Sequence, residues 1–284
     1  METVGMTKTA LVTGPSSGVG RLIALTLARQ GWTVALAGPS MQRLQPVLDA
    51  IRSAPVHANG HAAAGAFAVE LDLGHLDSVR RAAGSVMHRM PALDLLVNNA
   101  GVAGARGLTA SGFEAHFGVN HVGHFSLTRS LWPALERAGS SRVVTVASRA
   151  HYMAKAWNWD ALGRPTRTLS GIHEYAISKL ANILFCRELA RRGEPLGIAS
   201  FSLHPGVLDT RIWRSLPAWL QALNRLRLDT VDSVAHDIMA CVLEAPPGES
   251  GAYYSQGRAV TPSRLAQDAA LAAELWDRSL KWTD

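Results

Sequence analysis

Tyr175 and Lys179 lie four residues apart in "HEYAISKLANILF" (residues 173–185), a run with helical periodicity. On a helix these two positions share one face, so the ammonium lies one turn from the phenol. A cation in a low-dielectric site stabilises a phenolate; lowering a phenol pKa from about 10 to neutrality takes roughly 4 kcal/mol. The pair could therefore exchange a proton near neutral pH. A packed Tyr beside a solvated Lys is the alternative, and the elements that position the pair decide between the two.

A glycine-rich loop precedes the first helical run. "TGPSSGVGR" (13–21) follows an apolar strand and opens a helix, with the spacing G-x-x-x-G-x-G at Gly14, Gly18 and Gly20. Glycines allow a tight turn and close approach of a ligand, and the helix N-terminus offers free N–H groups to a pyrophosphate. A plain strand-to-helix turn is the alternative. The position of the loop favours a dinucleotide site, where perturbed titratable groups such as Tyr175 and Lys179 are expected.

Short apolar runs alternate with helical runs along the whole chain. We expect strands at 9–14, 33–38, 66–73, 94–101, 142–148, 198–206 and 251–255, and helices near 19–30, 40–53, 76–90, 112–138, 173–193, 231–244 and 263–280. This alternation predicts an α/β fold, a doubly wound, mainly parallel sheet of seven strands covered by helices on both faces. We predict one domain over 1–284, with an insertion at 149–172 and a further segment at 211–229 outside the alternation.

Composition narrows the class of protein. Of 284 residues, 18% are charged and 48% apolar, which indicates a globular chain. The net charge of +6 comes from scattered arginines without an aromatic-lined basic stripe, so we expect no nucleic-acid partner and an anionic small molecule instead. The polar start leaves no room for a signal peptide, and no apolar run reaches the roughly 18 residues of a membrane span. With two isolated cysteines, a cytoplasmic location is the simplest interpretation.

Three further motifs carry a family resemblance: "NNAG" (98–101), a lone Ser at the end of the fifth strand, and Y-x-x-x-K. With the glycine spacing, they resemble the short-chain dehydrogenase/reductase family in order and spacing from residue 8 to about 210. "FGVNHVGHFSLT", "SKLANILFCREL" and "HPGVLDT" are similar to retinol dehydrogenases and their bacterial relatives. The resemblance implies a Rossmann sheet of order 3-2-1-4-5-6-7 and hydride transfer between NAD(P)(H) and a carbonyl or secondary alcohol.

The resemblance also assigns a catalytic group. Tyr175 would exchange the proton, and Lys179 would lower its pKa and bind the nicotinamide ribose. Ser148 would hold the substrate oxygen, although it could simply start a turn. The family usually has Ser-Ser here, whereas this chain has Ala147-Ser148. Asn120 would hold a water of a proton relay, although an Asn bonded to helix backbone is the alternative.

Cofactor contacts follow from the same resemblance. We expect them from Gly14, Ser16, Ser17, Gly18, Val19, Gly20, Arg21, Ser40, Arg43, Asp72, Leu73, Asn99, Ala100, Gly101, Tyr175, Lys179, Pro205, Gly206, Val207 and Thr210. Asp72 would meet the adenine or cap the helix after it. Asn98 would tie strands together, and His204 would be structural.

The choice of nicotinamide depends on the end of the second strand. An acid there would select NAD through the ribose 2′-OH, but Gly38 occupies that position, and Pro39 stands where relatives often carry Arg. Without a carboxylate to repel a 2′-phosphate, and with Ser40, Arg43 and Arg21 nearby, NADP(H) is favoured over NAD(H).

Residues 211–229 resemble a mobile substrate lid. Ordinary helix packing and an amphipathic helix on a membrane are alternatives, although no second anchor is visible and a membrane partner is not favoured. Half of the eight Trp lie in this lid and in 149–172, at Trp157, Trp159, Trp213 and Trp219. If both segments border the pocket, the small-molecule substrate is bulky and apolar or aromatic.

Several other functions remain to be weighed. A dinucleotide-sensing protein without turnover would share the fold, but such relatives often lose the Tyr or Lys. An imine, hemiaminal or enone could replace the carbonyl. His121 and His124 lack a third metal ligand at useful spacing, so we expect no metal, and no G-x-S-x-G elbow supports a hydrolase. Relatives often pair through helices near 112–135 and 173–193, which makes a homodimer possible.

Overall fold

Thr9–Thr13 (β1) forms the centre of a sheet whose strands are apolar on both faces. In the computed structural model, which describes residues 7–53, 65–206, 235 and 237–284, Ala10, Leu11 and Val12 are fully buried. The other strands are Thr33–Gly38 (β2), Ala66–Glu70 (β3), Leu95–Asn98 (β4), Ser141–Val146 (β5), Ile198–His204 (β6), Tyr253–Ser255 (β7) and Arg258–Val260 (β8). The sheet order is β3-β2-β1-β4-β5-β6-β7-β8.

The predicted doubly wound fold and strand order are confirmed, with one more strand than the seven expected. Strands β1 to β7 are parallel, and β8 is an antiparallel addition that pairs Tyr253 with Val260. Strands β3 to β6 end two or three residues earlier than expected, because the chain leaves the hydrogen-bonded ladder at the carboxyl edge of the sheet. The order reverses between β1 and β4, and ligands of such folds bind at this switch point.

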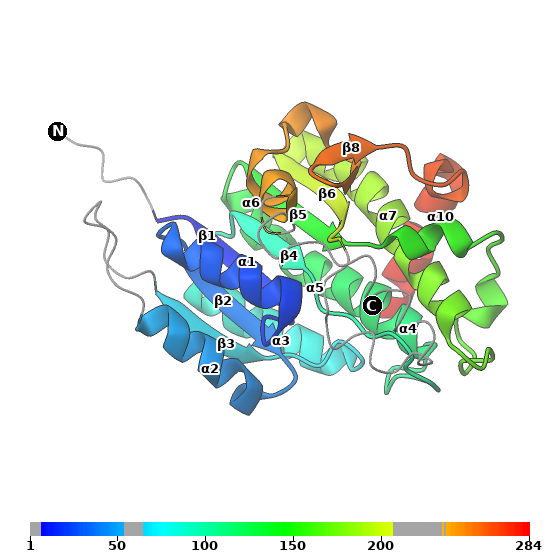
Figure 1. Ribbon diagram of the computed structural model, residues 1–284, viewed down its shortest axis with the longest axis horizontal. Helices are drawn as coiled ribbons and strands as arrows, with labels where there is room; N and C mark the ends of the chain where they lie inside the picture. The colour runs from blue at the N-terminus through cyan, green and yellow to red at the C-terminus, as the bar shows by residue number, and fades with distance from the viewer. Residues whose placement is uncertain (1–6, 54–64, 207–234, 236) are drawn as a thin grey trace.

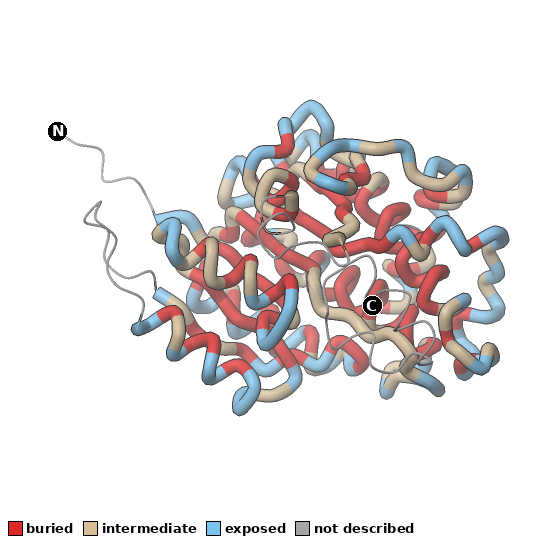
Figure 2. The backbone as a smooth tube through the Cα atoms, in the orientation of Figure 1, coloured by how far each residue is buried: buried red, intermediate tan, exposed pale blue. Residues whose placement is uncertain are grey.

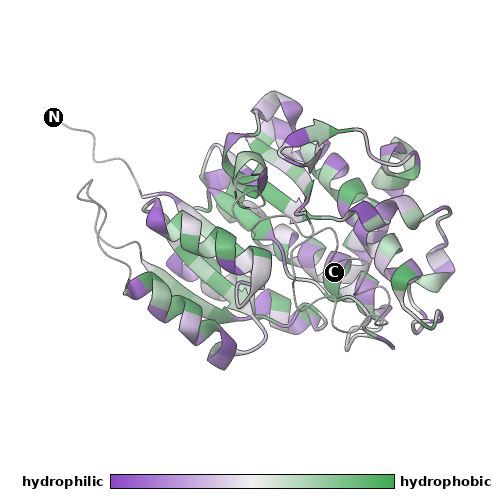
Figure 3. Ribbon diagram, viewed as in Figure 1, coloured by the Kyte–Doolittle hydropathy of each residue, from purple (hydrophilic) through white to green (hydrophobic). Residues whose placement is uncertain are grey.

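Helices cover both faces of the sheet (Figure 1). Gly18–Arg29 (α1) and Met41–Arg52 (α2) pack on one face together with the π-helical turn Ala240–Glu244. Leu76–Arg89 (α3), Gly123–Ser130 (α5), Ile172–Gly193 (α7) and Ala269–Thr283 (α10) pack on the other. Figure 2 shows the resulting buried core running along the strands, and Figure 3 shows polar residues on the outer sides of the helices.

The helix expected over 112–138 is broken into four pieces. Ala115–Phe117 (α4) leads into a π-helical turn, Gly118–Val122, before α5, and Trp132–Arg137 (α6) follows a break with Pro in its first turn. A π turn inserts an extra residue and re-aims side chains, and it is frequent at functional sites. Asn120 lies inside this turn, so the break places one of the expected catalytic residues.

The C-terminal helix α10 lies along α7 and α5. Trp276 stacks on Phe185 at a centroid distance of 5.9 Å and meets Phe125 edge-on at 5.0 Å. Arg192 pairs with Asp277 at 3.0 Å, and the buried His121 lies 3.0 Å from the Ser279 hydroxyl. The chain's own last helix thus covers part of α5 and α7, two of the helices through which relatives were expected to pair.

Candidate active site

A cleft of about 860 Å³ opens at the carboxyl edge of the sheet, at the switch point between β1 and β4. Its lining includes most of the residues expected to bind a cofactor, together with Ser148, Tyr175 and Lys179. A second groove of about 1000 Å³ lies at the amino ends of the strands, beside Lys8, Asp94 and Arg142, and contains none of the expected site residues. The chemistry therefore belongs to the smaller cleft.

One side of the cleft, the glycine wall, consists of Gly14, Ser16 to Val19 and Asn99 to Gly101. Gly20 lies just beneath it, where an added Cβ would be 2.3 Å from the Asn99 amide nitrogen and 2.5 Å from the Gly14 carbonyl oxygen. Such distances exclude any side chain. The first turn of α1 holds no acid, and its N-cap Ser17 makes no side-chain capping bond. The N–H groups of this turn are therefore available to an anion, so the wall fits a dinucleotide pyrophosphate.

The opposite side, the tyrosine wall, consists of Ser148, Tyr175 and Lys179. All three are buried: Ser148 follows β5, and the other two lie one turn apart on α7. The Ser148 hydroxyl hydrogen-bonds the Tyr175 side chain and also accepts the Ala150 N–H at 3.1 Å, so it starts a turn as well. The Lys179 Nζ donates to the Val146 carbonyl at 2.9 Å and lies 5.7 Å from the centre of the Tyr175 ring.

The expectation of an unusually acidic phenol is wrong for this geometry. Burial raises the pKa of Tyr175 to about 12, and its hydrogen bond to Ser148 lowers that pKa only in part. Burial also lowers the pKa of Lys179 to about 8, because the low-dielectric interior disfavours its charge. The Nζ lies over the ring and is hydrogen-bonded to a carbonyl of β5, so desolvation outweighs its attraction for a phenolate. Burial thus favours the neutral form of the Tyr175 phenol in this structure.

Asn120 lies in the π turn, buried behind the residues that line the cleft. Its Oδ1 accepts the Val102 N–H at 2.8 Å, and its Nδ2 donates to the Val102 carbonyl at 3.0 Å and to the Ser178 hydroxyl at 2.9 Å. An added Cβ on Gly101 would be 3.1 Å from Asn120 Oδ1 and 3.6 Å from Lys179 Nζ. The structure thus brings Asn120, Lys179 and the "NNAG" turn together, and the Asn side chain fixes the chain that lines the cleft.

His124 links the π turn that carries Asn120 to the glycine wall. Its Nδ1 lies 3.0 Å from the Asn120 carbonyl oxygen, and its Nε2 lies 3.0 Å from the Thr13 hydroxyl. Thr13 Oγ1 in turn accepts the N–H groups of Asn99 and Ala100, both at 2.9 Å. Burial lowers the pKa of His124 to about 4, so the ring is neutral and can donate through Nδ1 while accepting through Nε2. Both nitrogens of His124 are engaged within the protein.

The structural role expected of Asn98 belongs to Asn99. The Asn99 amide nitrogen donates to the Thr13 carbonyl at 2.7 Å and to the Gly14 carbonyl at 3.3 Å, which ties β4 to the end of β1. Asn98 instead points to the other side and donates to the Thr128 hydroxyl of α5 at 3.0 Å. Successive residues of a strand point to opposite faces of the sheet, which explains why Asn99 and not Asn98 faces β1.

Asp72, Leu73, Pro205 and Gly206 line the cleft as expected. The Asp72 carboxylate accepts the Gly74 N–H at 2.8 Å, and the N-cap of α3 is His75, so Asp72 does not cap that helix. The structure does not bring Arg21, Ser40 or Arg43 into the cleft lining: both arginines are exposed, and Ser40 caps α2 by accepting the Arg43 N–H at 3.4 Å. Val207, Thr210 and the expected lid 211–229, with Trp213 and Trp219, lie outside the described residues.

Trp157 and Trp159 do not line the cleft, contrary to expectation. The two rings meet edge-on at 5.2 Å; Trp157 also contacts Phe117 at 6.4 Å, and Trp159 contacts Trp282 of α10 at 6.4 Å. Packing against the C-terminal helix therefore accounts for these two aromatic residues. They carry no argument for an aromatic substrate.

Several residues at the site were not predicted from the sequence. Ser178 holds the Asn120 amide, and Glu114 and His116 stand behind Tyr175. The position of Ser178 on the turn of α7 between Tyr175 and Lys179 was a local signal, since i+3 neighbours share a helix face. Glu114 and His116 gave no signal of a role at this site, because the contacts that join them to Thr166 and Tyr175 connect residues far apart in the sequence.

Comparison with known proteins gives a consistent result. Residues 8–160 match the short chain dehydrogenase family. The chain is 33% identical to human retinol dehydrogenase 13, over 96% of this chain and 84% of that protein, and 37% identical to mouse polyprenol dehydrogenase, over 97% and 84%. A crystal structure of an uncharacterised Mycobacterium paratuberculosis protein is 32% identical with a TM-score of 0.73, covering 97% of this chain and 93% of that one. No helix among the described residues is long and apolar enough to cross a membrane.

Proposed function

Because the chain belongs to the short-chain dehydrogenase family and is a retinol-dehydrogenase-like oxidoreductase, we propose that it interconverts a carbonyl and a secondary or primary alcohol of a bulky, apolar small molecule. The observation that carries this proposal is the meeting of the two walls. Tyr175, Ser148 and Lys179 face a glycine wall shaped for a dinucleotide, within one cleft. A structural Tyr–Lys pair would need no such neighbour.

The residues of the tyrosine wall divide the work. The bound nicotinamide dinucleotide supplies or accepts the hydride at carbon. In reduction, the neutral Tyr175 phenol donates its proton to the substrate oxygen, and the Ser148 hydroxyl hydrogen-bonds that oxygen as negative charge develops on it. Lys179 supplies the positive charge that compensates the phenolate left behind. Asn120 holds the Val102 segment against the cofactor site.

The substrate class rests on the lining of the cleft and on the relatives. Small apolar side chains dominate beyond the glycine wall, among them Val102, Ala103, Ala105 and Ala147. Small side chains leave width for a large apolar ligand. The names of the relatives above give retinol and polyprenol as their substrates, both long and apolar, which supports a ligand of the same kind here.

For the cofactor we propose NADP(H) over NAD(H). Gly38 and Pro39 line the cleft at the end of β2, so neither of these two positions carries a carboxylate that would repel a 2′-phosphate. Turnover with NADPH and with NADH at equal concentration tests this choice. A tenfold preference for NADH would contradict it.

A substrate panel read by nicotinamide absorbance tests the activity itself. We expect turnover with long-chain or cyclic apolar aldehydes, ketones or alcohols, and little with short polar ones. Turnover of imines, hemiaminals or enones alone would keep the hydride chemistry and change the substrate. Tight dinucleotide binding without turnover of any substrate would instead support a non-catalytic dinucleotide sensor.

A further inference from the structure

Glu114 is a buried carboxylate that has no role in the reaction proposed above. Only 3% of it is exposed, yet it accepts four hydrogen bonds. Its Oε2 accepts the N–H groups of His116 at 2.8 Å and Phe117 at 3.0 Å, and its Oε1 accepts from His116 Nδ1 at 2.9 Å and from the Thr166 hydroxyl at 2.5 Å. Four donors around a carboxylate offset the cost of burying its charge, and removing that carboxylate would leave them unpaired.

The Glu114 carboxylate fixes an imidazole against the expected acid. His116 is fully buried, and its Nε2 has no hydrogen-bond partner among the described residues, so the carboxylate is the one polar anchor of the ring. The His116 ring meets the Tyr175 ring edge-on, with centroids 6.1 Å apart and planes at 72°. Edge-to-face pairs favour one relative orientation. His116 therefore supports the phenol ring itself, whereas Ser148 contacts the phenol through a side-chain hydrogen bond.

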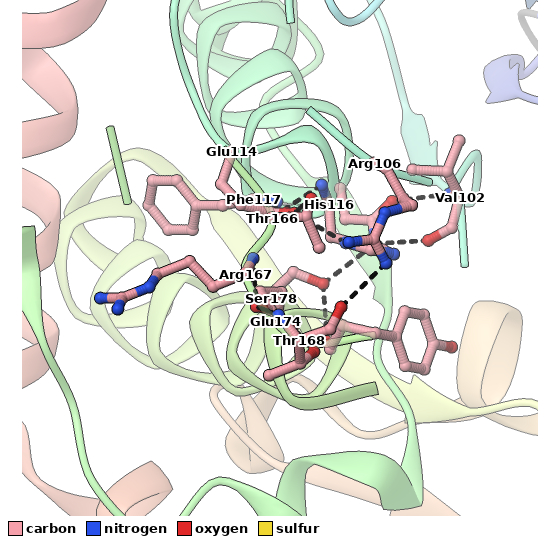
Figure 4. Close-up of polar contacts among 12 residues, drawn as sticks. Val102, Arg106, Glu114, His116, Phe117, Thr166, Arg167, Thr168, Glu174 and Ser178 are labelled. Atoms are coloured by element: carbon pink, nitrogen blue, oxygen red, sulfur yellow. Dashed lines mark hydrogen bonds and ion pairs between the residues drawn. The ribbon is translucent and has the colours of Figure 1, made fainter. Parts of the chain in front are cut away.

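Glu114 also holds the loop 166–171, which runs directly into α7 (Figure 4). Glu174, the neighbour of Tyr175, accepts the N–H groups of Arg167 at 3.0 Å and Thr168 at 2.9 Å, and the Thr168 hydroxyl. Arg106 closes the loop from outside by donating to the Thr168 and Leu169 carbonyls at 2.9 and 2.7 Å. Burial alone would raise the pKa of Glu174, but these hydrogen bonds lower it overall, so the carboxylate stays ionised.

The end of this loop touches both the imidazole and the tyrosine. Gly171 has φ +66°, and a Cβ there would be 3.0 Å from His116 Cε1. The Gly171 carbonyl accepts the Tyr175 N–H at 2.9 Å, which starts the α7 hydrogen-bond ladder. The backbone of Tyr175 thus depends on the loop, and its ring depends on His116. Glu114 anchors both.

We propose that Glu114 and His116 are positioning residues for Tyr175, the carboxylate locking both the imidazole that supports the phenol ring and the loop that sets the start of α7. This inference rests on the proposed function for its kinetic test. Neither residue lines the cleft, so the pair acts on proton transfer and not on dinucleotide binding. Displacing the proton donor from its position should lower kcat far more than it weakens dinucleotide binding.

Glu114→Gln tests the pair, with Glu188→Gln as the matched control. Glu188 is also a buried carboxylate and lies on α7, the helix that carries Tyr175, but its partners are Arg191 and Arg192. We expect Glu114→Gln to lower kcat about 10- to 100-fold while the dinucleotide Kd changes less than about twofold. Glu188→Gln should lower the Tm without lowering kcat. If Glu114→Gln lowers only the Tm, like its control, the proposal is wrong.

Milder variants keep the test decisive if Glu114→Gln does not fold. His116→Phe keeps a ring beside Tyr175 and should retain more of kcat than His116→Ala. Thr166→Ser, which keeps the hydroxyl, should match the unaltered protein, whereas Thr166→Val should lower kcat. Equal kcat values across all four variants would overturn the proposal.

A spectroscopic readout separates this inference from the proposed function. The chain has four Tyr, so 3-fluorotyrosine labelling gives a ¹⁹F spectrum simple enough to assign Tyr175 by its loss in Tyr175→Phe. We expect His116→Ala and Glu114→Gln to shift or broaden the Tyr175 signal, and Glu188→Gln to leave it in place. An unmoved Tyr175 signal in both test variants contradicts the positioning role. Absence of turnover by the unaltered enzyme would contradict the proposed function alone.

Discussion

The two walls of the cleft are built in opposite ways. The glycine wall depends on the absence of side chains at its glycines. Its shape is therefore set by the backbone and by close contacts such as that between Gly20 and the Asn99 amide. The tyrosine wall depends on a few buried polar side chains, which are held in place by contacts with two other segments, 114–116 and 166–168. Affinity should therefore depend on the first wall and rate on the second, and each variant below tests that division.

Tyr175→Phe should have the largest effect. Loss of the proton donor should lower kcat by about 10³-fold, as expected when a general acid is removed. The hydroxyl contributes little to the glycine wall, so the dinucleotide Kd should stay within a few-fold. Steady-state kinetics and a fluorescence titration measure the two quantities. Full turnover in this variant would remove the tyrosine wall from the chemistry.

Gly20→Ala should have the opposite effect and weaken dinucleotide binding more than it lowers kcat. A methyl group there would collide with the Asn99 amide and the Gly14 carbonyl, which are backbone or tightly bonded groups that cannot move freely. We expect the dinucleotide Kd to rise about tenfold or more, equivalent to about 1.4 kcal/mol, while kcat at saturation falls much less. An unchanged Kd would show that the loop tolerates a side chain.

The residues changed in these two variants belong to the part of the site that the sequence could predict. The glycine spacing, "NNAG" and Y-x-x-x-K are local patterns, and the family resemblance that they carry implied the sheet order and the catalytic group. The hydrogen bond from Thr166 to Glu114 joins residues 52 apart, and its meaning depends on how the insertion folds back. Trp157 and Trp159 show the same limit. Their pattern predicted large apolar contacts, but the partner was α10 and not a substrate.

Lys179→Met should separate activity from stability. Burial lowers the pKa of Lys179 from its ordinary 10.5 to about 8, so at pH 7 the buried ammonium costs the folded state about 3 kcal/mol. The variant should lose most turnover yet unfold at higher urea concentration, although it gives up a hydrogen bond to Val146 worth about 1 kcal/mol.

The pH dependence of the stability difference between Lys179→Met and the unaltered protein gives an internal control. Below pH 8 the folded enzyme carries the buried charge; from pH 8 to 10.5 only the unfolded chain remains protonated, and above that neither state is. The stability advantage of the variant should therefore shrink as pH rises from about 8 towards 10.5. A variant less stable than the unaltered protein at pH 7 would contradict the assignment.

Thr13→Val and His124→Phe should have the smallest effects and test the link between the π turn and the glycine wall. Each should lower the free energy of unfolding by about 1–2 kcal/mol, through buried groups left unpaired. The double variant should lose less than the sum, with a coupling of about 1 kcal/mol in a double-mutant cycle. Thr13→Ser, which keeps the hydroxyl, is the control. Strict additivity would mean that the two side chains act independently.

Helix α10 bears on how copies of this protein meet. Trp276, Asp277 and Ser279 already engage α7 and the helical run before it, on the surface that the sequence suggested for pairing. The aromatic side chains that α5 and α7 present on this side already have their partner, because Trp276 packs on Phe125 and Phe185 within one protomer. Any contact between two copies at these helices would therefore include α10 as part of its surface.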